Sequence, residues 1–169
     1  MEQKFIHVIE EHRKIIYKVC SFYCKSEMDK EDLFQEIVLR LWKGFSSFEG
    51  KSKISTWIYK VSMNTAITIN RLNERRPKLS PWGENEFTLM KEIPDSDFNE
   101  EMTFLFTCIN KLNDLEKAIM HLYLDEVSYQ DIAAIVGIST SNVATKISRI
   151  KIKLKNIIEQ QQTVNYGNK

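Results

Sequence analysis

Side chains suited to reading nucleic-acid bases and binding phosphates are concentrated between residues 140 and 155. Hydroxyl and amide groups form hydrogen bonds with base edges, while cationic groups bind base edges or phosphate oxygens. The candidates are Thr140, Ser141, Asn142, Thr145, Lys146, Arg149, Lys151 and Lys153, with Lys155 beyond them. This composition predicts a helix that contacts DNA. The alternative is a lysine-rich face that only keeps the chain in solution.

Residues 129–147 have the spacing of a helix-turn-helix. Ala133 is small enough to let two helices approach, and Gly137, four positions on, can adopt the left-handed backbone of a tight turn. Ser139 is a good N-cap for a second helix, whose apolar side begins with Val143 and Ile147. The unit is therefore predicted to present the polar cluster on the outside of its second helix.

Metal or catalytic chemistry has little support in the remaining residue pattern. Cys20 and Cys24 lie one helical turn apart, and His7 and His12 are nearby, but no motif supplies four ligands at the usual spacing. These cysteines, with Cys108, are predicted to be small apolar residues in a reduced core. No G-x-S-x-G, H-E-x-x-H or P-loop motif is present, so we expect no enzymatic activity, no cofactor, no metal and no small-molecule substrate.

The charges are distributed unevenly along the chain, although the net charge is only +1. Residues 51–80 carry seven Lys or Arg and one acidic residue, and residues 132–169 carry six and one. Between them, residues 81–131 carry three basic and twelve acidic residues. Two separated basic segments predict two places of contact with phosphates.

Apolar residues repeat every three or four positions through most of the chain, which predicts helices. The clearest segments are Lys4–Lys25, Asp32–Lys43, 54–69 and Met102–Leu112. Asp29 is predicted to cap the second segment, and Asn113 and Ser128 to cap two later helices. Trp42 and Trp57 fall at predicted core positions.

The predicted fold is all-α, with two small helical domains. An N-terminal helical bundle spans residues 1–72, and a C-terminal helix-turn-helix bundle spans residues 100–160, followed by a tail at 161–169. Prolines and acidic residues accumulate over 73–99, which predicts a flexible acidic linker. Neither a signal peptide nor an apolar run of ~20 residues is present, so we expect a cytoplasmic protein without its own membrane span.

Two segments resemble the extracytoplasmic-function (ECF) group of bacterial RNA polymerase sigma factors. DLFQEIVLRLWKGFSSFEGKSKISTWIYKVSMNTAITINR, residues 32–71, is similar to the region that binds polymerase and recognises the −10 element. It has the family's DxxQE, FxG, TW and N-x-A elements in register. LNDLEKAIMHLYLDEVSYQDIAAIVGISTSNVATKISRIKIKL, residues 112–154, resembles the region that reads the −35 element.

The resemblance implies a sigma factor with three binding surfaces and with core RNA polymerase, promoter DNA and an anti-sigma factor as partners. Polymerase binding is implied for Asp32, Gln35, Glu36 and Leu39, for which a solvated helix face is the alternative. Binding of the −10 element is implied for Phe48, Gly50, Lys51, Ser52 and Asn64, with Arg71, Arg75 and Arg76 on backbone phosphates. Phe48 is equally compatible with a core residue that anchors its loop.

Two positions depart from the family pattern. Asn113 follows Leu112 where family members commonly have Pro, and Asn is itself a good helix cap. Glu126 replaces a frequent glycine before Ser128, so the local turn geometry is in question.

Two other functions would explain part of the sequence. A stand-alone helix-turn-helix regulator accounts for the second domain but leaves the DxxQE and TW helices without a role, and it would usually bind as a dimer. The other is an interaction protein, such as a helical adaptor, which would be indifferent to DNA in a salt-dependent binding assay on a promoter-like forked duplex.

Overall fold

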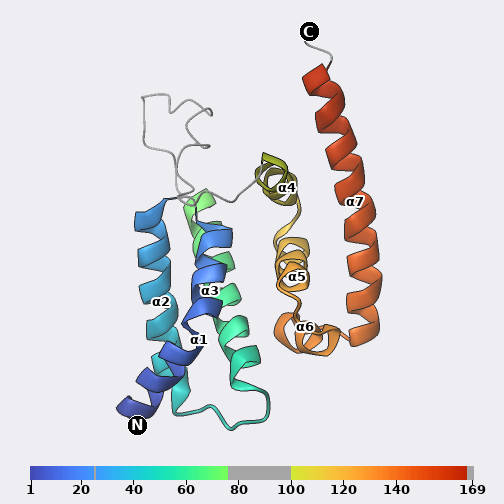
Figure 1. Ribbon diagram of the computed structural model, residues 1–169. Coiled ribbons are helices and arrows are strands. Elements are labelled where there is room, and N and C mark those ends of the chain that lie inside the picture. Colours follow the sequence, from blue (N-terminus) through green and yellow to red (C-terminus); the bar gives the residue numbers. More distant parts are fainter. Residues whose placement is uncertain (25, 76–99, 167–169) are drawn as a thin grey trace. The chain divides into compact units, whose positions relative to one another are not determined.

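The computed structural model describes residues 1–24, 26–75 and 100–166 (Figure 1). Within these residues the chain forms seven α-helices and no strand. It divides into two compact units, residues 1–94 and 95–169, each considered separately below. The prediction of an all-helical chain with two domains is confirmed. None of the described helices is long and apolar enough to cross a membrane.

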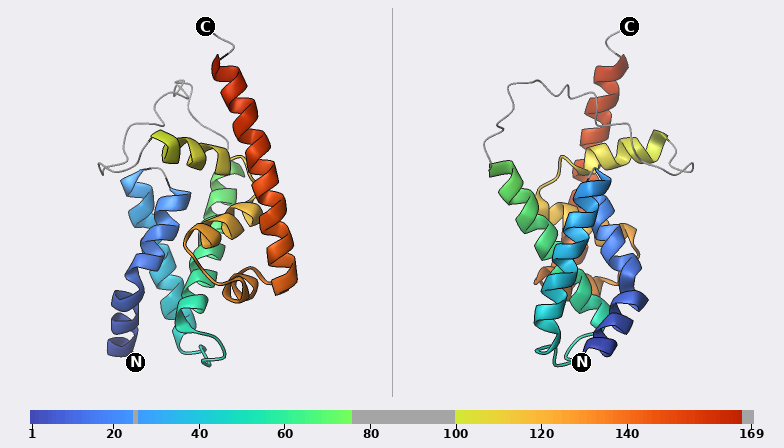
Figure 2. Two further views of the ribbon diagram at one scale, coloured as in Figure 1. Left: turned by 45° about the vertical axis from the view of Figure 1, so that its right-hand side comes forward. Right: turned by 90° about the vertical axis from the view of Figure 1, so that its left-hand side faces the viewer.

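The first unit is a bundle of three helices, α1 (Glu2–Tyr23), α2 (Glu27–Phe45) and α3 (Ile54–Arg75), which lie side by side in Figures 1 and 2. Each helix contacts the other two. Ile16 of α1, Ile37 and Leu41 of α2, and Ile58 of α3 are completely buried between them. Because these residues recur at helical spacing, the apolar pattern alone accounts for the bundle.

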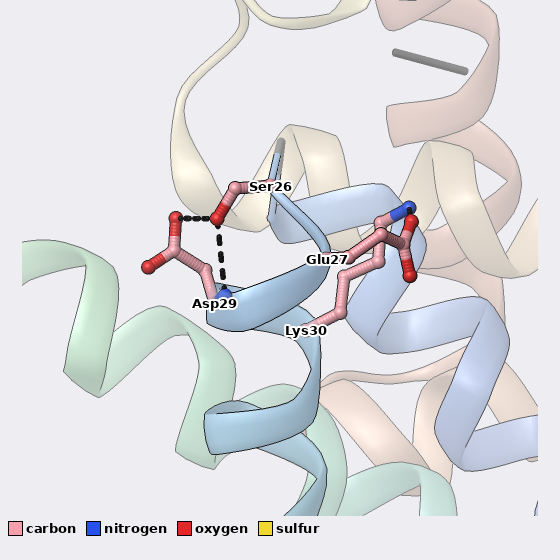
Figure 3. Close-up of polar contacts among 4 residues, drawn as sticks. All are labelled: Ser26, Glu27, Asp29 and Lys30. Atoms are coloured by element: carbon pink, nitrogen blue, oxygen red, sulfur yellow. Dashed lines mark hydrogen bonds and ion pairs between the residues drawn. The ribbon is translucent and has the colours of Figure 1, made fainter. Parts of the chain in front are cut away.

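The N-terminus of α2 begins earlier than the sequence predicted, and its cap is a different residue (Figure 3). The Ser26 hydroxyl accepts a hydrogen bond from the Asp29 backbone N–H at 3.0 Å and donates one to the Asp29 carboxylate at 2.6 Å. Lys30 and Glu27 form an ion pair in the same turn. The prediction that Asp29 caps the helix was therefore wrong, because Asp29 already lies in its first turn.

The second unit contains α4 (Glu100–Ile109), α5 (Asp114–Leu124), α6 (Tyr129–Val136) and α7 (Thr140–Tyr166). Both predicted caps are confirmed. The Asn113 side chain accepts from Glu116 N–H at 2.9 Å while Glu116 accepts from Asn113 N–H at 3.2 Å, and Ser128 accepts from Asp131 N–H at 3.1 Å. The long helix α7 packs on the other three helices.

Two helices extend past the predicted domain limits. Helix α3 continues to Arg75, beyond residue 72, and α7 continues to Tyr166, beyond residue 160. The remainder of the predicted linker, 76–99, and residues 167–169 lie outside the described residues.

Trp42 and Trp57 are more exposed than their helical positions predicted. Trp42 is 40% exposed and meets Phe5 edge-to-face, with ring centroids 5.0 Å apart. Trp57 is half-buried. The core prediction for Trp42 was therefore wrong, because Phe5 covers only part of its ring.

Cys20 and Cys108 are buried, as predicted, and Cys24 is half-buried. Burial, followed by the neighbouring Cys24, raises the pKa of the Cys20 thiol to about 12. Burial and the charge of Asp29 raise the pKa of Cys24 to about 11. The neutral thiol is therefore favoured at both positions.

Candidate nucleic-acid interface

The turn between α6 and α7 has the geometry that the sequence predicted. Gly137 has a φ of 76°, which a residue with a side chain rarely adopts. The backbone N–H groups of Gly137 and Ile138 donate to the Ala133 carbonyl at 2.9 and 3.2 Å. The Ser139 hydroxyl then accepts from the Asn142 N–H at 3.3 Å at the start of α7. These contacts stop one helix and start the next within three residues.

Helix α7 separates an apolar inner side from a polar outer side. Val143, Ile147, Ile150 and Leu154 are buried against the rest of the unit. The predicted contact residues Thr140, Ser141, Asn142, Thr145 and Arg149 are exposed, and Lys146 is half-buried. Helical spacing also exposes residues absent from the sequence prediction, among them Ala144, Ser148 and Ile152. The outer side therefore carries more than the cationic and hydroxyl groups first identified.

Two of the candidate lysines of α7 contact α5 and remain exposed. Lys151 Nζ donates to the Tyr123 hydroxyl at 2.7 Å and lies 4.3 Å from the centre of that ring. Lys153 Nζ is 2.7 Å from Glu116 Oε2. Glu116 and Tyr123 were missed by sequence reasoning, because contacts across 37 and 28 residues leave no local pattern.

The outer side of α2 presents the residues matched to polymerase binding. Asp32, Gln35 and Leu39 are exposed, and Leu39 retains 44% exposure despite being apolar. Glu36 accepts from Arg40 Nε at 2.7 Å on the same side. Spacings of three and four residues place this set opposite the buried Ile37.

The loop between α2 and α3 is fixed at both ends. Ser47 closes the end of α2 through its N–H and hydroxyl, which donate to the Gly44 carbonyl at 3.1 and 2.8 Å. Phe48 is half-buried, with its ring centroid 5.1 Å from that of Trp57. Gly50 has a φ of 70°. Lys51 and Ser52 are exposed, and Lys51 forms an ion pair with Glu49. Phe48 therefore anchors the loop while keeping part of its ring accessible.

Helix α3 carries the remaining candidates for the −10 element. Asn64 and Arg71 are exposed and share a side, since seven residues make about two turns. Arg75 lies in the last turn of α3 and Arg76 falls outside the described residues. Lys60 and Thr68 are exposed on the same side but were not among the candidates chosen from the sequence. The helical spacing of positions 60, 64, 68 and 71 would have pointed to them once Asn64 was chosen.

The chain matches two family descriptions in order: Sigma-70 region 2 over residues 8–76 and Sigma-70, region 4 over residues 105–154. It is also 30% identical over 146 residues to the ECF RNA polymerase sigma-E factor of Haemophilus influenzae, covering 79% of this chain and 77% of that protein. The chain belongs to the ECF sigma factors.

A second relative agrees with this assignment, and two solved structures share the fold. ECF sigma factor SigW of Bacillus subtilis is 26% identical over 161 residues, covering 88% of this chain and 85% of SigW. The fold is similar to RpoE in complex with NepR from Bartonella quintana, at 18% identity and a TM-score of 0.64, covering 94% of this chain and 96% of that one. It is likewise similar to CnrH in complex with the cytosolic domain of CnrY, at 17% identity and a TM-score of 0.68, covering 95% and 90%.

An ECF sigma factor directs promoter-specific initiation by RNA polymerase through its regions 2 and 4, and it is not itself an enzyme. The match of region 2 accounts for the three-helix bundle, which the stand-alone regulator left without a role.

Proposed function

We propose that the binding of polymerase, the −10 element and the −35 element is divided among α2, the loop before α3 together with α3, and α7. Residues 1–72 and 100–160 are the two functional domains. The observation that carries the proposal is that the candidates whose side chains the structure describes lie on the accessible side of one helix or in one fixed loop, opposite a buried apolar side.

The N-terminal domain captures an unstacked base of the −10 element. A flipped base is held by an aromatic wall and by hydrogen bonds to its edge. The accessible part of Phe48 supplies the wall, Asn64 supplies an amide that both donates and accepts, and Gly50, Lys51 and Ser52 complete the loop. Backbone phosphates of the promoter are bound by Arg71 and Arg75 of α3 and by Arg76, which follows them in the sequence.

Helix α7 enters the major groove at the −35 element, with its N-terminal residues at the bases. Thr140, Ser141, Asn142 and Thr145 present hydrogen-bonding groups to base edges, and Lys146 and Arg149 contact bases or phosphates. Lys151 and Lys153 stand further along the helix, where phosphate binding competes with their contacts to α5.

Helix α2 binds the core polymerase through its outer side. Leu39 supplies apolar surface at the C-terminal end of this set, and Asp32, Gln35 and Glu36 supply carboxylates and an amide on the turns before it.

Substitution on α2 tests the docking surface. Asp32→Arg and Leu39→Arg place a cation where the surface is acidic or apolar, so the folded variants should lose co-elution with core polymerase. Glu11→Arg, a similar charge change at an exposed position of α1, serves as the control and should co-elute. Co-elution of the doubly substituted, folded chain at the wild-type level would refute the assignment.

We further infer that the chain acts in the cytoplasm, with the polymerase, and that an anti-sigma factor regulates it. The similarity to RpoE and CnrH, solved with NepR and CnrY, supports the inference of an anti-sigma factor. Tagged protein purified from unstressed native cells should carry a stoichiometric partner that blocks core binding. Recovery of the chain with core polymerase alone under those conditions would contradict it.

A further inference from the structure

Phe48, in the loop matched to the −10 element, packs against the ring of Trp57. The resemblance to the family gave Trp57 no role in binding this element. Trp57 lies in the first turn of α3, and its backbone N–H donates a hydrogen bond to the Lys53 carbonyl at 3.1 Å. Its ring centroid is 5.1 Å from that of Phe48 and 6.5 Å from that of Phe45. The indole therefore joins the end of α2, the loop and the start of α3.

Gly44, a glycine inside α2, lies against the Trp57 ring. A Cβ atom built on Gly44 would lie 3.2 Å from Cζ2 of Trp57, which is closer than a carbon atom normally approaches. Glycine lowers the stability of a helix relative to alanine, and Gly44 stands in the last turn of α2, where no left-handed backbone requires it. The close approach of Trp57 is the feature in the structure that accounts for glycine at this position.

Backbone hydrogen bonds also hold the start of the loop, which carries Phe48, against the end of α2. The N–H of Phe48 donates to the Phe45 carbonyl at 3.3 Å, and Ser47 binds the Gly44 carbonyl through two hydrogen bonds. The residues that hold Phe48 thus all lie beside the indole. A shift of the Trp57 ring would therefore move the Phe48 ring, which lies against it.

We propose that Trp57, seated against Gly44, is a positioning residue that fixes the Phe48 ring and thereby sets base discrimination at the −10 element. This inference rests on the proposed function of the Phe48 loop. Trp57 acts through Phe48 and does not itself read the base.

The test measures rates of open-complex formation by core polymerase with the full chain, on promoters that carry each of the four bases at every −10 position. We expect Gly44→Ala and Trp57→Leu to reduce the discrimination ratio about tenfold, since small misplacements of a binding group are costly. Affinity for core polymerase should not change. Trp57→Phe, which keeps an aromatic ring, should retain most of the discrimination.

Two comparisons separate positioning from loss of folding. The folding of Gly44→Ala is compared with that of Lys43→Ala, an exposed control in the same turn that should leave discrimination unchanged. If Trp57→Leu does not fold, Gly44→Ala and Trp57→Phe still decide the question.

The outcomes that overturn the inference differ from one another. Unchanged discrimination in Gly44→Ala, with discrimination lost in Phe48→Ala, would leave the loop assignment intact and remove Trp57 from it. Loss in Trp57→Phe as large as in Trp57→Leu would show that the indole itself is required at the base. Unchanged discrimination in Phe48→Ala would refute the proposed function of the loop, and the inference with it.

Discussion

Lys153 of α7 is bound to Glu116 of α5, with Nζ 2.7 Å from Oε2. The same carboxylate oxygen accepts the Asn113 N–H at 3.2 Å in the capping box of α5. Near the other end of α5, Lys151 binds the hydroxyl and ring of Tyr123. Two lysines of a basic helix therefore hold that helix to the domain at two points.

This arrangement predicts different salt dependences for cations on the same helix. Lys155→Ala should lower the slope of log affinity against log salt for −35 binding by about one unit, because one phosphate contact is lost. Lys153→Met should leave the slope nearly unchanged and lower the free energy of unfolding by about 0.5 kcal/mol, since the ion pair is partly exposed. Binding titrations of the two variants at several salt concentrations measure both slopes. A full unit lost in Lys153→Met would show that Lys153 leaves Glu116 to bind DNA.

The ion pair also predicts a dependence on pH. Partial burial alone would raise the pKa of Glu116, but hydrogen bonds from Lys153 and the Asn113 N–H, with the charge of Lys153, lower it below its ordinary value of 4.5. A lowered pKa in the folded state means that the unfolded state binds protons more readily, so stability is lost as the pH falls below about 4.5. Unfolding of the C-terminal unit should therefore respond less to acid in Glu116→Gln than in the wild type. Equal acid sensitivity of the two proteins would contradict the assignment.

Replacing Glu126 by glycine should stabilise the C-terminal domain. Glu126 has a φ of 56°, the only positive φ of a non-glycine residue among those described. A side chain in this left-handed region costs about 1 kcal/mol. Glu126→Gly should raise the free energy of unfolding by up to about 1 kcal/mol, less the entropy that glycine adds to the unfolded chain. Urea unfolding measures the change, and Glu126→Ala, which keeps the strain, should show no such gain.

Local sequence signals predicted the helix-turn-helix well. Gly137, Ser139, Asn113 and Ser128 each act within a few residues of their partners, so the residue type and its position sufficed. The replacement of a frequent glycine by Glu126 likewise pointed to a turn that the structure shows to be left-handed.

Features that depend on distant segments were not predictable in the same way. The start of α2 was misplaced because Ser26 and Asp29 are both good caps, and the apolar pattern that marks the helix begins only at Leu33. Helical position alone suggested that Trp42 is buried, but its exposure depends on how far Phe5 of another helix covers it. The contacts of Lys151 and Lys153 with α5 required the packed domain.

Asn64 should affect melting more than polymerase binding. Unstacking one base costs a few kcal/mol, and Asn64→Ala removes the amide that would hold the flipped base. Open complexes on a duplex promoter should therefore form more slowly, while affinity for core polymerase is unchanged. A template with the −10 bases already unpaired should recover much of the activity. Permanganate footprinting follows the melting, and a normal rate on the duplex would refute the role of Asn64.

Run-off transcription with purified core polymerase tests most directly whether the N-terminal domain reads the −10 element and the C-terminal domain reads the −35 element. With the wild-type chain, we expect transcripts from promoters that carry matched −35 and −10 elements. Arg149→Ala should lose discrimination only at −35, and Phe48→Ala only at −10. Substitutions in either domain that alter discrimination at both elements alike, or at neither, would contradict the account.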